Sequence, residues 1–557
     1  MRLRRCAMGF HKKVIYQLYP KSFYDSNGDG VGDLRGIIEK IDYLKSLHVD
    51  MIWFNPFFVS PQYDNGYDVA DYRNIDPRFG TMADFDELAK KLKEAGIDIM
   101  LDMVLNHTST EHEWFQKALA GDKHYQAYYY IRPPKPDGSL PTNWESKFGG
   151  PAWAPFGDTG NYYLHLYERH QADLDWHNPA VRQEAAAIIN FWRAKGVHGF
   201  RFDVLNAIGK AEKLVDAPPE VASKTLYTDT PIVLDYLKEL AANSFGQDQN
   251  SVTVGEMSST TVKNSIAYTK PENHGLSMVF QFHHLKTDYK NGEKWTKEPY
   301  NFNALRDILH TWGQQLDQGG GWQALFWNNH DQPRALNRFG NVDKYRVKSA
   351  EMLAAAIHLS RGTPYIYMGE EIGMTDPHYH SMADYVDIEA KNAYKALLKE
   401  GKSEKAAFAI ILAKARDNSR TPMQWDDSAN AGFTTGTPWL RPTNQKEINV
   451  KDELAHGEIF QFYQKLIALR KQYDVISDGS YEPFGIDIDR LYAYERVAGE
   501  DHLLVLNNFS DKAITVPLPN RFQSAKVLIT NESGLIQTAT MTLPPYATIA
   551  LLTSEEN

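Results

Sequence analysis

The chain has 557 residues, more than one hydrophobic core usually organises, so we expect either several domains or one large domain with satellites. Its 42% hydrophobic and 24% charged residues are ordinary for a soluble globular protein. The formal net charge is -11 and no run of Lys or Arg occurs, which argues against nucleic acid or an anionic membrane as the main partner.

The N-terminal region predicts a cytoplasmic protein. Cys6 is the single cysteine, so no internal disulfide can form, as is typical of chains in a reducing compartment. Residues 1–13 are basic but lack an apolar core, and no stretch of about 18 apolar residues follows. We therefore expect neither a signal peptide nor a membrane span. Met8 is an alternative start, which would make residues 1–7 an extension.

Short apolar runs rich in β-forming residues recur along the first two thirds of the chain. Amphipathic helical stretches lie between them, at 34–46, 82–95, 181–194 and 350–359. This alternation indicates βα units and a parallel sheet. The strand-like runs number eight, which favours a closed (β/α)8 barrel over an open sheet. They are 14–18, 51–55, 97–104, 199–204, 252–255, 278–282, 324–327 and 365–368.

Two long insertions, and a change in the spacing of apolar residues near the C-terminus, predict the domain organisation. Residues 106–175 are rich in Pro, Gly, Trp and Tyr and too long for an ordinary βα loop, so we expect an excursion domain over the mouth of the barrel. A second excursion runs from about 375 to 425. After a helical stretch at 460–471 apolar and polar residues alternate, which predicts an antiparallel β-sandwich. The barrel would then comprise 1–105 and 176–475, and the sandwich 476–557.

Three acidic residues, Asp203, Glu256 and Asp331, stand at or just after the ends of the fourth, fifth and seventh strand-like runs. A carboxylate at the C-terminal end of a barrel strand points into the mouth, where active sites form. One such residue alone is more often a solvated loop residue. Three of them favour a catalytic site, the more so because further polar residues fall at the same level, namely His107, Arg201 and His330.

The acidic residues suit glycoside hydrolysis, which needs one carboxylate to attack the anomeric carbon and one carboxylic acid to protonate the leaving oxygen. Arg201 lies two residues before Asp203 and so on the same face of its strand, where its guanidinium favours an ionised, nucleophilic Asp203. Glu256 would need a raised pKa to hold a proton at neutral pH. Chemistry alone assigns no role to Asp331.

Five ordered motifs resemble the α-amylase family, glycoside hydrolase family 13. They are DMVLNH (102–107), QADLDW (171–176), GFRFDV (199–204), GEM (255–257) and NNHD (328–331). The resemblance implies a retaining mechanism with Asp203 as nucleophile, Glu256 as general acid/base and Asp331 as the carboxylate that holds the hydroxyls of the distorted sugar. It also implies a glucose-binding subsite lined by Asp64, Tyr67, His107, Arg201, His330 and Arg416.

The segment DSNGDGVGD (25–33) is a candidate calcium site. Asp25, Asn27, Asp29 and Asp33 offer side-chain oxygens and Val31 a backbone carbonyl, a donor set that suits Ca²⁺. The twelfth position is Gly36 rather than Glu, so an EF-hand is not expected. Taken alone, an acidic turn capping a helix is as good an interpretation. The resemblance, which implies one structural calcium in such a loop, favours the ion.

Four further segments resemble one branch of this family and thereby indicate the substrate. The segments at 253–261, 142–150, 282–295 and 319–334 resemble the branch of the family that hydrolyses trehalose 6-phosphate. Such a phosphorylated disaccharide requires cationic donors for its phosphate. Lys286 and Lys294, just after the sixth run, are candidates, with His283 and His284 as further donors. Each lysine taken singly is more often a solvated surface residue.

Three alternatives stay open. An oligo-1,6-glucosidase would use the same chemistry on isomaltose-type sugars without a phosphate. Transglycosylation or sucrose isomerisation would use the same covalent intermediate. A binding subunit without catalysis is disfavoured because the acidic trio is intact and no membrane anchor is evident. No organic cofactor and no obligate protein partner is expected.

Overall fold

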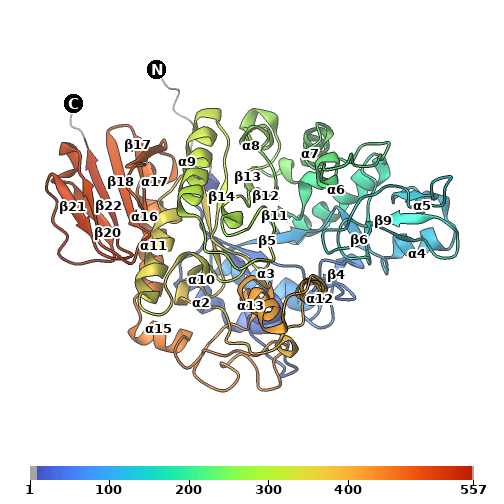
Figure 1. The fold of residues 1–557 in the computed structure, drawn as a ribbon, viewed down its shortest axis with the longest axis horizontal. Helices are drawn as coiled ribbons and strands as arrows, with labels where there is room; N and C mark the ends of the chain where they lie inside the picture. Colours follow the sequence, from blue (N-terminus) through green and yellow to red (C-terminus); the bar gives the residue numbers. More distant parts are fainter. Residues whose placement is uncertain (1–8, 555–557) are drawn as a thin grey trace.

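The computed structural model describes residues 9–554, so Cys6 and Met8 lie outside the described residues. Eight parallel strands form one sheet in the order β13-β12-β11-β5-β2-β1-β15-β14. A parallel bridge between Val279 and Gln323 joins the two edge strands and closes the sheet. The predicted barrel is thus confirmed (Figure 1). Its strands are β1 (Ile15–Leu18), β2 (Met51–Phe54), β5 (Asp98–Met103), β11 (Gly199–Phe202), β12 (Val252–Glu256), β13 (Met278–Phe280), β14 (Ala324–Leu325) and β15 (Thr363–Tyr367).

The barrel interior is filled by side chains from alternate strand positions. Met51, Met100, Val254 and Phe280 belong to one buried cluster inside the closed sheet. Gly199, the first residue of β11, lies where an added Cβ would come within 2.6 Å of the Met100 side chain. The barrel is therefore packed closely enough to require glycine at this position.

Helices surround the barrel, and those at Met82–Glu94, Pro179–Ala194, Arg346–His358 and Ile459–Gln472 match the stretches expected at 82–95, 181–194, 350–359 and 460–471. The predicted helix at 34–46 is instead divided at Lys40, whose backbone leaves the helical conformation. No helix within residues 9–554 is long and apolar enough to cross a membrane. The principal helices are α1 (Leu34–Glu39), α2 (Ile41–Ser46), α3 (Met82–Glu94), α6 (Pro179–Ala194), α7 (Ile232–Asn243), α8 (Val262–Thr269), α9 (Phe302–Gly319), α10 (Ala335–Phe339), α11 (Arg346–His358) and α16 (Ile459–Gln472).

The excursion domain, residues 106–175, projects to the right in Figure 1. Its first and last strands, β6 (His107–Ser109) and β10 (Gln171–Asp173), pair antiparallel, so the chain leaves and re-enters the barrel at one place. Between them lie two short helices and a three-stranded sheet. These are α4 (Glu113–Leu119), α5 (Lys123–Gln126), β7 (Ile131–Arg132), β8 (Trp153–Pro155) and β9 (Tyr162–Leu164).

The second excursion supplies α12 (Ile388–Lys399), α13 (Glu404–Lys414) and α14 (Asp417–Arg420). In Figure 1 α12 and α13 lie below the barrel strands. The C-terminal domain, on the left of that view, consists of a five-stranded and a two-stranded antiparallel sheet. Its strands are β16 (Glu482–Phe484), β17 (Leu491–Ala498), β18 (Asp501–Asn508), β19 (Ile514–Pro517), β20 (Lys526–Thr530), β21 (Thr540–Leu543) and β22 (Thr548–Ser554).

Candidate active site

The acidic trio lies at the C-terminal ends of the barrel strands. Asp203 follows β11 directly, and its backbone N–H still donates to the Met103 carbonyl of β5 (3.0 Å). Glu256 is the last residue of β12, and Asp331 lies in the loop after β14. Val204 adopts φ 37°, a left-handed conformation that β-branched residues rarely take, so the chain turns sharply just after Asp203.

Arg201 joins the carboxylates of the site. Its guanidinium, 1% exposed, donates to Asp102 (2.6 Å) and to Asp203 (2.7 Å), and a second nitrogen donates to Glu256. Because one guanidinium contacts both the Asp203 and the Glu256 carboxyl groups, the two groups lie close together, as the short carboxyl separation of a retaining hydrolase requires.

The pKa values of the two carboxyl groups differ. Burial raises the pKa of Asp203 to about 6, although the charge of Arg201 opposes the rise. Burial raises the pKa of Glu256 to about 8, and the charge of Asp203 adds to the rise while Arg201 opposes it. At pH 7 Asp203 is therefore mainly ionised and Glu256 mainly protonated, which are the states that a nucleophile and a general acid require.

Asp331 stands among positive groups. Arg420 donates to its carboxylate at 2.6 Å, and Arg416 does so at 3.4 Å. Burial opposes ionisation, but neighbouring His330, Arg416 and Arg420 hold the pKa of Asp331 well below its usual range. With 30% of its side chain exposed, Asp331 presents a permanent negative charge to the cleft.

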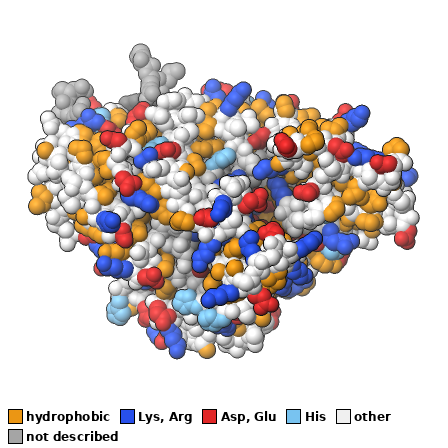
Figure 2. Space-filling model, viewed as in Figure 1, with side chains coloured by type: hydrophobic (Ala, Val, Ile, Leu, Met, Phe, Trp, Pro, Cys, Tyr) orange, Lys and Arg blue, Asp and Glu red, His pale blue; other side chains and the backbone are white. Residues whose placement is uncertain are grey.

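The residues expected to bind glucose lie together around the trio. Arg416 forms an ion pair with Asp64 at 3.0 Å. The Tyr67 hydroxyl lies 2.7 Å from Nε2 of His330, and the two rings are stacked. His107 Nε2 lies 3.1 Å from the Tyr67 carbonyl oxygen. In Figure 2 acidic and basic side chains are interspersed around the hollow between the barrel and the excursion domain.

Several residues of the site were not singled out from the sequence. Arg420 holds Asp331, and Asp387, fully buried, pairs with Arg416 at 2.5 Å. Asp102 accepts hydrogen bonds from Arg201 and from the Tyr67 hydroxyl. The available signals were Arg420 in the segment RDNSR and Asp102 in the motif DMVLNH. Asp387 carries no recognisable motif.

The predicted phosphate ligands differ in their surroundings. Lys294 forms an ion pair with Glu389 at 2.8 Å, whereas Lys286 donates to the Ser258 carbonyl at 3.2 Å. His283 Nε2 lies 2.7 Å from the Thr260 carbonyl oxygen and His284 Nε2 2.9 Å from that of Phe326. Of the four, Lys286 alone is a cation without a carboxylate partner in the described structure.

The candidate calcium loop is ordered by its own hydrogen bonds. Asp25 accepts from the backbone N–H groups of Asn27, Gly28 and Gly30, and Asp33 accepts from that of Gly36 at the start of α1. All potential donors are oxygens, as Ca²⁺ prefers. Within residues 9–554, however, His, Cys, Asp and Glu side chains form no cluster of three or more suited to a metal ion.

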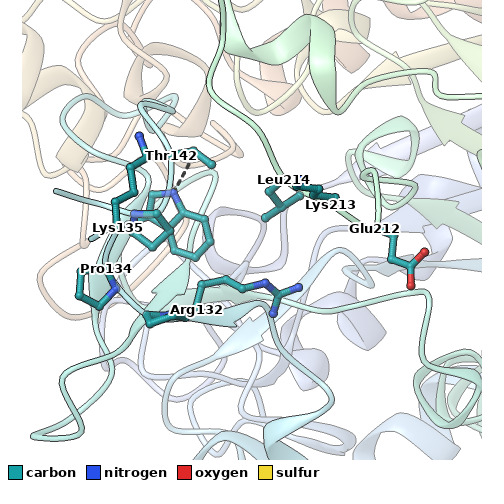
Figure 3. Close-up of a pocket in the computed structure, with 10 residues that line it drawn as sticks. Arg132, Pro134, Lys135, Thr142, Glu212, Lys213 and Leu214 are labelled. Atoms are coloured by element: carbon teal, nitrogen blue, oxygen red, sulfur yellow. Dashed lines mark hydrogen bonds between the residues drawn. The ribbon is translucent and has the colours of Figure 1, made fainter. Parts of the chain in front are cut away.

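A separate pocket of about 490 Å³ lies between the excursion domain and residues 212–214. Arg132, Lys135 and Glu212 line it, and the Trp153 indole donates to Thr142 at 2.8 Å (Figure 3). Lys135 pairs with Asp216. None of the acidic trio lines this pocket.

Comparison with known proteins shows the family. The catalytic domain of alpha-amylases matches residues 17–479, and the C-terminal domain of the alpha-amylase SusG matches residues 491–550. The chain belongs to the α-amylase family of glycoside hydrolases. A trehalose-6-phosphate hydrolase of Bacillus subtilis is 48% identical over 97% of both chains. An oligo-1,6-glucosidase of Parageobacillus thermoglucosidasius is 47% identical, over 93% of this chain and 94% of that one. The crystal structure of trehalose-6-phosphate hydrolase from Bacillus licheniformis superimposes with a TM-score of 0.94 at 49% identity, covering 98% of this α-amylase family chain and all of that one.

Proposed function

We propose that this protein hydrolyses trehalose 6-phosphate to glucose and glucose 6-phosphate through a covalent glucosyl-enzyme. The observation that carries the chemistry is the pair of carboxyl groups on Arg201, with Asp203 ionised and Glu256 protonated at pH 7. The substrate rests on the similarity to trehalose-6-phosphate hydrolases along nearly the whole chain.

The reaction proceeds in two displacements. A carboxylate oxygen of Asp203 attacks the anomeric carbon while the Glu256 carboxyl proton passes to the glycosidic oxygen, which leaves as the hydroxyl of glucose 6-phosphate. The Glu256 carboxylate then takes a proton from water, and the water oxygen displaces Asp203 from the anomeric carbon. Asp331, held by Arg420, would accept hydrogen bonds from the ring hydroxyls of the bound glucose.

We expect the substrate to be a small phosphorylated disaccharide, and we expect neither nucleic acid, a membrane nor an obligate protein partner. A cytoplasmic location fits a sugar that already carries phosphate and a chain with one cysteine. We also infer that the loop from Asp25 to Asp33 binds a structural Ca²⁺ through Asp25, Asn27, Asp29, Asp33 and the Val31 carbonyl.

Hydrolysis of isomaltose-type sugars is the second candidate, because an oligo-1,6-glucosidase is 47% identical to this chain. The two functions share the acidic trio and differ in whether a phosphate is recognised.

The test measures glucose release by the purified protein from trehalose 6-phosphate, trehalose and isomaltose at equal concentration. We expect a strong preference for the phosphorylated sugar. Preference for isomaltose would overturn the substrate and leave the catalytic trio in place. The variant Asp203→Asn removes the nucleophile and should lose activity on every substrate while remaining folded. Wild-type turnover by this variant would refute the catalytic assignment.

A further inference from the structure

Lys147, in the excursion domain, lies close to the catalytic centre. Its amine is 3.1 Å from the Tyr167 hydroxyl and 5.1 Å from the centre of that ring. The Tyr167 ring is in turn 5.6 Å from the ring of His107 in the predicted glucose-binding subsite. One aromatic side chain thus separates Lys147 from that subsite.

Two further lysines lie near this region. Lys286 ends a short 3-10 helix (His284–Lys286), and its amine donates to the Ser258 carbonyl, two residues after Glu256, at 3.2 Å. Lys224 belongs to another short helix (Ser223–Leu226), which is followed by Tyr227, whose ring lies 5.2 Å from the ring of Trp144, three residues before Lys147.

The Lys147 side chain as a whole is exposed, but the protein surrounds its amine, and this burial lowers the pKa of Lys147 to about 8. The charges of Lys224 and Lys286 lower this pKa further, while those of Glu256 and Asp203 raise it. The charge of Lys224 likewise lowers the pKa of Lys286. The amine of Lys147 therefore interacts electrostatically with those of Lys224 and Lys286, and also with both catalytic carboxyl groups.

The three lysines share a feature that Lys294 lacks. The Lys147 amine contacts the Tyr167 hydroxyl and the Lys286 amine the Ser258 carbonyl, and within residues 9–554 no ion pair with a carboxylate forms at either amine or at that of Lys224. Lys294 is instead neutralised by Glu389 at 2.8 Å. Unpaired like charges repel one another, and a bound dianion would relieve this repulsion through charge-assisted hydrogen bonds.

A cavity adjoins Lys147. It has a volume of about 450 Å³ and extends from Lys147 and Phe148 to Trp295 and to helix α12. The Arg416 guanidinium lies 5.1 Å from the Phe148 ring, so the cavity borders the residues expected to hold glucose. There is space beside Lys147 for a second sugar ring and its substituent.

We propose that Lys147, with Lys224 and Lys286, binds the phosphate of the leaving glucose, and that Lys147 determines the preference for a phosphorylated substrate. The inference rests on the proposed function. It assigns the phosphate to a lysine of the excursion domain and to Lys224 in place of Lys294, whose charge is already neutralised.

The experiment compares kcat/KM for trehalose 6-phosphate with kcat/KM for a neutral aryl α-glucoside in Lys147→Met. Loss of one charge-assisted hydrogen bond should reduce the ratio of the two values about 10- to 100-fold. Lys147→Arg keeps the charge and should recover part of the ratio. Lys135→Met is the matched control, since Lys135 also belongs to the excursion domain but is paired with Asp216, and its ratio should stay at the wild-type value.

The outcomes separate this inference from the proposed function. If the wild type shows no preference for trehalose 6-phosphate, the proposed function fails and the inference with it. If the wild type shows the preference and the double variant Lys147→Met/Lys224→Met keeps it, the inference alone is wrong. Equal losses on both substrates would mean that Lys147 acts structurally, which also overturns it.

Discussion

At the scale of single residues, one guanidinium governs the site. Arg201 is almost fully buried and contacts Asp102, Asp203 and Glu256. A single positive charge does not neutralise three carboxylates, so all three cannot ionise at neutral pH without a large cost in free energy. The proton that remains belongs mainly to Glu256, whose pKa is the higher of the catalytic pair. Burial of the site, with only the one charge of Arg201 to offset it, thus leaves Glu256 as the acid and Asp203 as the nucleophile.

This division predicts a bell-shaped pH profile of kcat/KM on a neutral disaccharide α-glucoside. Activity should fall below pH about 6 as Asp203 gains a proton, and above pH about 8 as Glu256 loses one. The two apparent values belong to the coupled pair. Glu256→Gln should lower kcat/KM by about 10²- to 10⁴-fold and abolish the alkaline limb. A wild-type rate still rising at pH 9 would contradict the assignment of the acid.

The catalytic residues predicted from the sequence occupy regular positions in the barrel strands. Asp203 and Glu256 stand at strand ends, and the alternation of a strand places Arg201 beside Asp203. Asp387 and Glu389, by contrast, reach the site from the second excursion, about 20 residues beyond the end of β15, the barrel strand that precedes them in the chain. Only tertiary folding brings Glu389 to Lys294, so the sequence could not show that this lysine is neutralised.

At the scale of elements, the eight strands were predictable because a strand buried on both faces is a short continuous apolar run. Closure of the barrel was harder to predict, since it requires the first strand, β1, to pair with the last, β15, about 350 residues further along the chain. The helices α4 and α5 were missed because seven and four residues are too few to show a helical period. Domain boundaries at 105/106 and 475/476 remain predictions.

The loop from Asp25 to Asp33 is an element whose role can be tested directly. If it binds Ca²⁺, excess EGTA should lower Tm by about 2 °C or more, because the ion stabilises only the folded state. Asp25→Ala should lower Tm in calcium and remove the response to EGTA, since Asp25 also orders the loop through three backbone N–H groups. Identical melting of the wild type with and without EGTA would refute a bound ion.

At the scale of the whole molecule, strand β17 joins the C-terminal domain to the barrel, because one of its faces packs within the C-terminal domain and the other packs against the barrel helices. Leu491 and Ala493 point into the core between the two C-terminal sheets. Tyr492 and Tyr494 belong to the main core, and the Tyr494 hydroxyl donates to the Ala356 carbonyl of α11 at 3.0 Å. Residues at alternate positions of β17 thus face the C-terminal core and the barrel in turn, so the residue pattern that predicted a sandwich also accounts for the contact with the barrel.

Arg496, on the same strand, should stabilise this junction. It is fully buried and donates to the carbonyls of Leu359, Ile476, Gly479 and Ser480 at 2.8 to 3.0 Å. Burial lowers the pKa of Arg496 to about 10, which leaves it charged at pH 7. Arg496→Met would leave these acceptors unpaired, so we expect a loss of about 3 kcal/mol in the free energy of unfolding, measured as a lower Tm at a fixed scan rate. Arg521→Met removes a more exposed arginine paired with Glu495 and should cost less than about 0.5 kcal/mol. If both variants melt alike, Arg496 does not hold the two domains together.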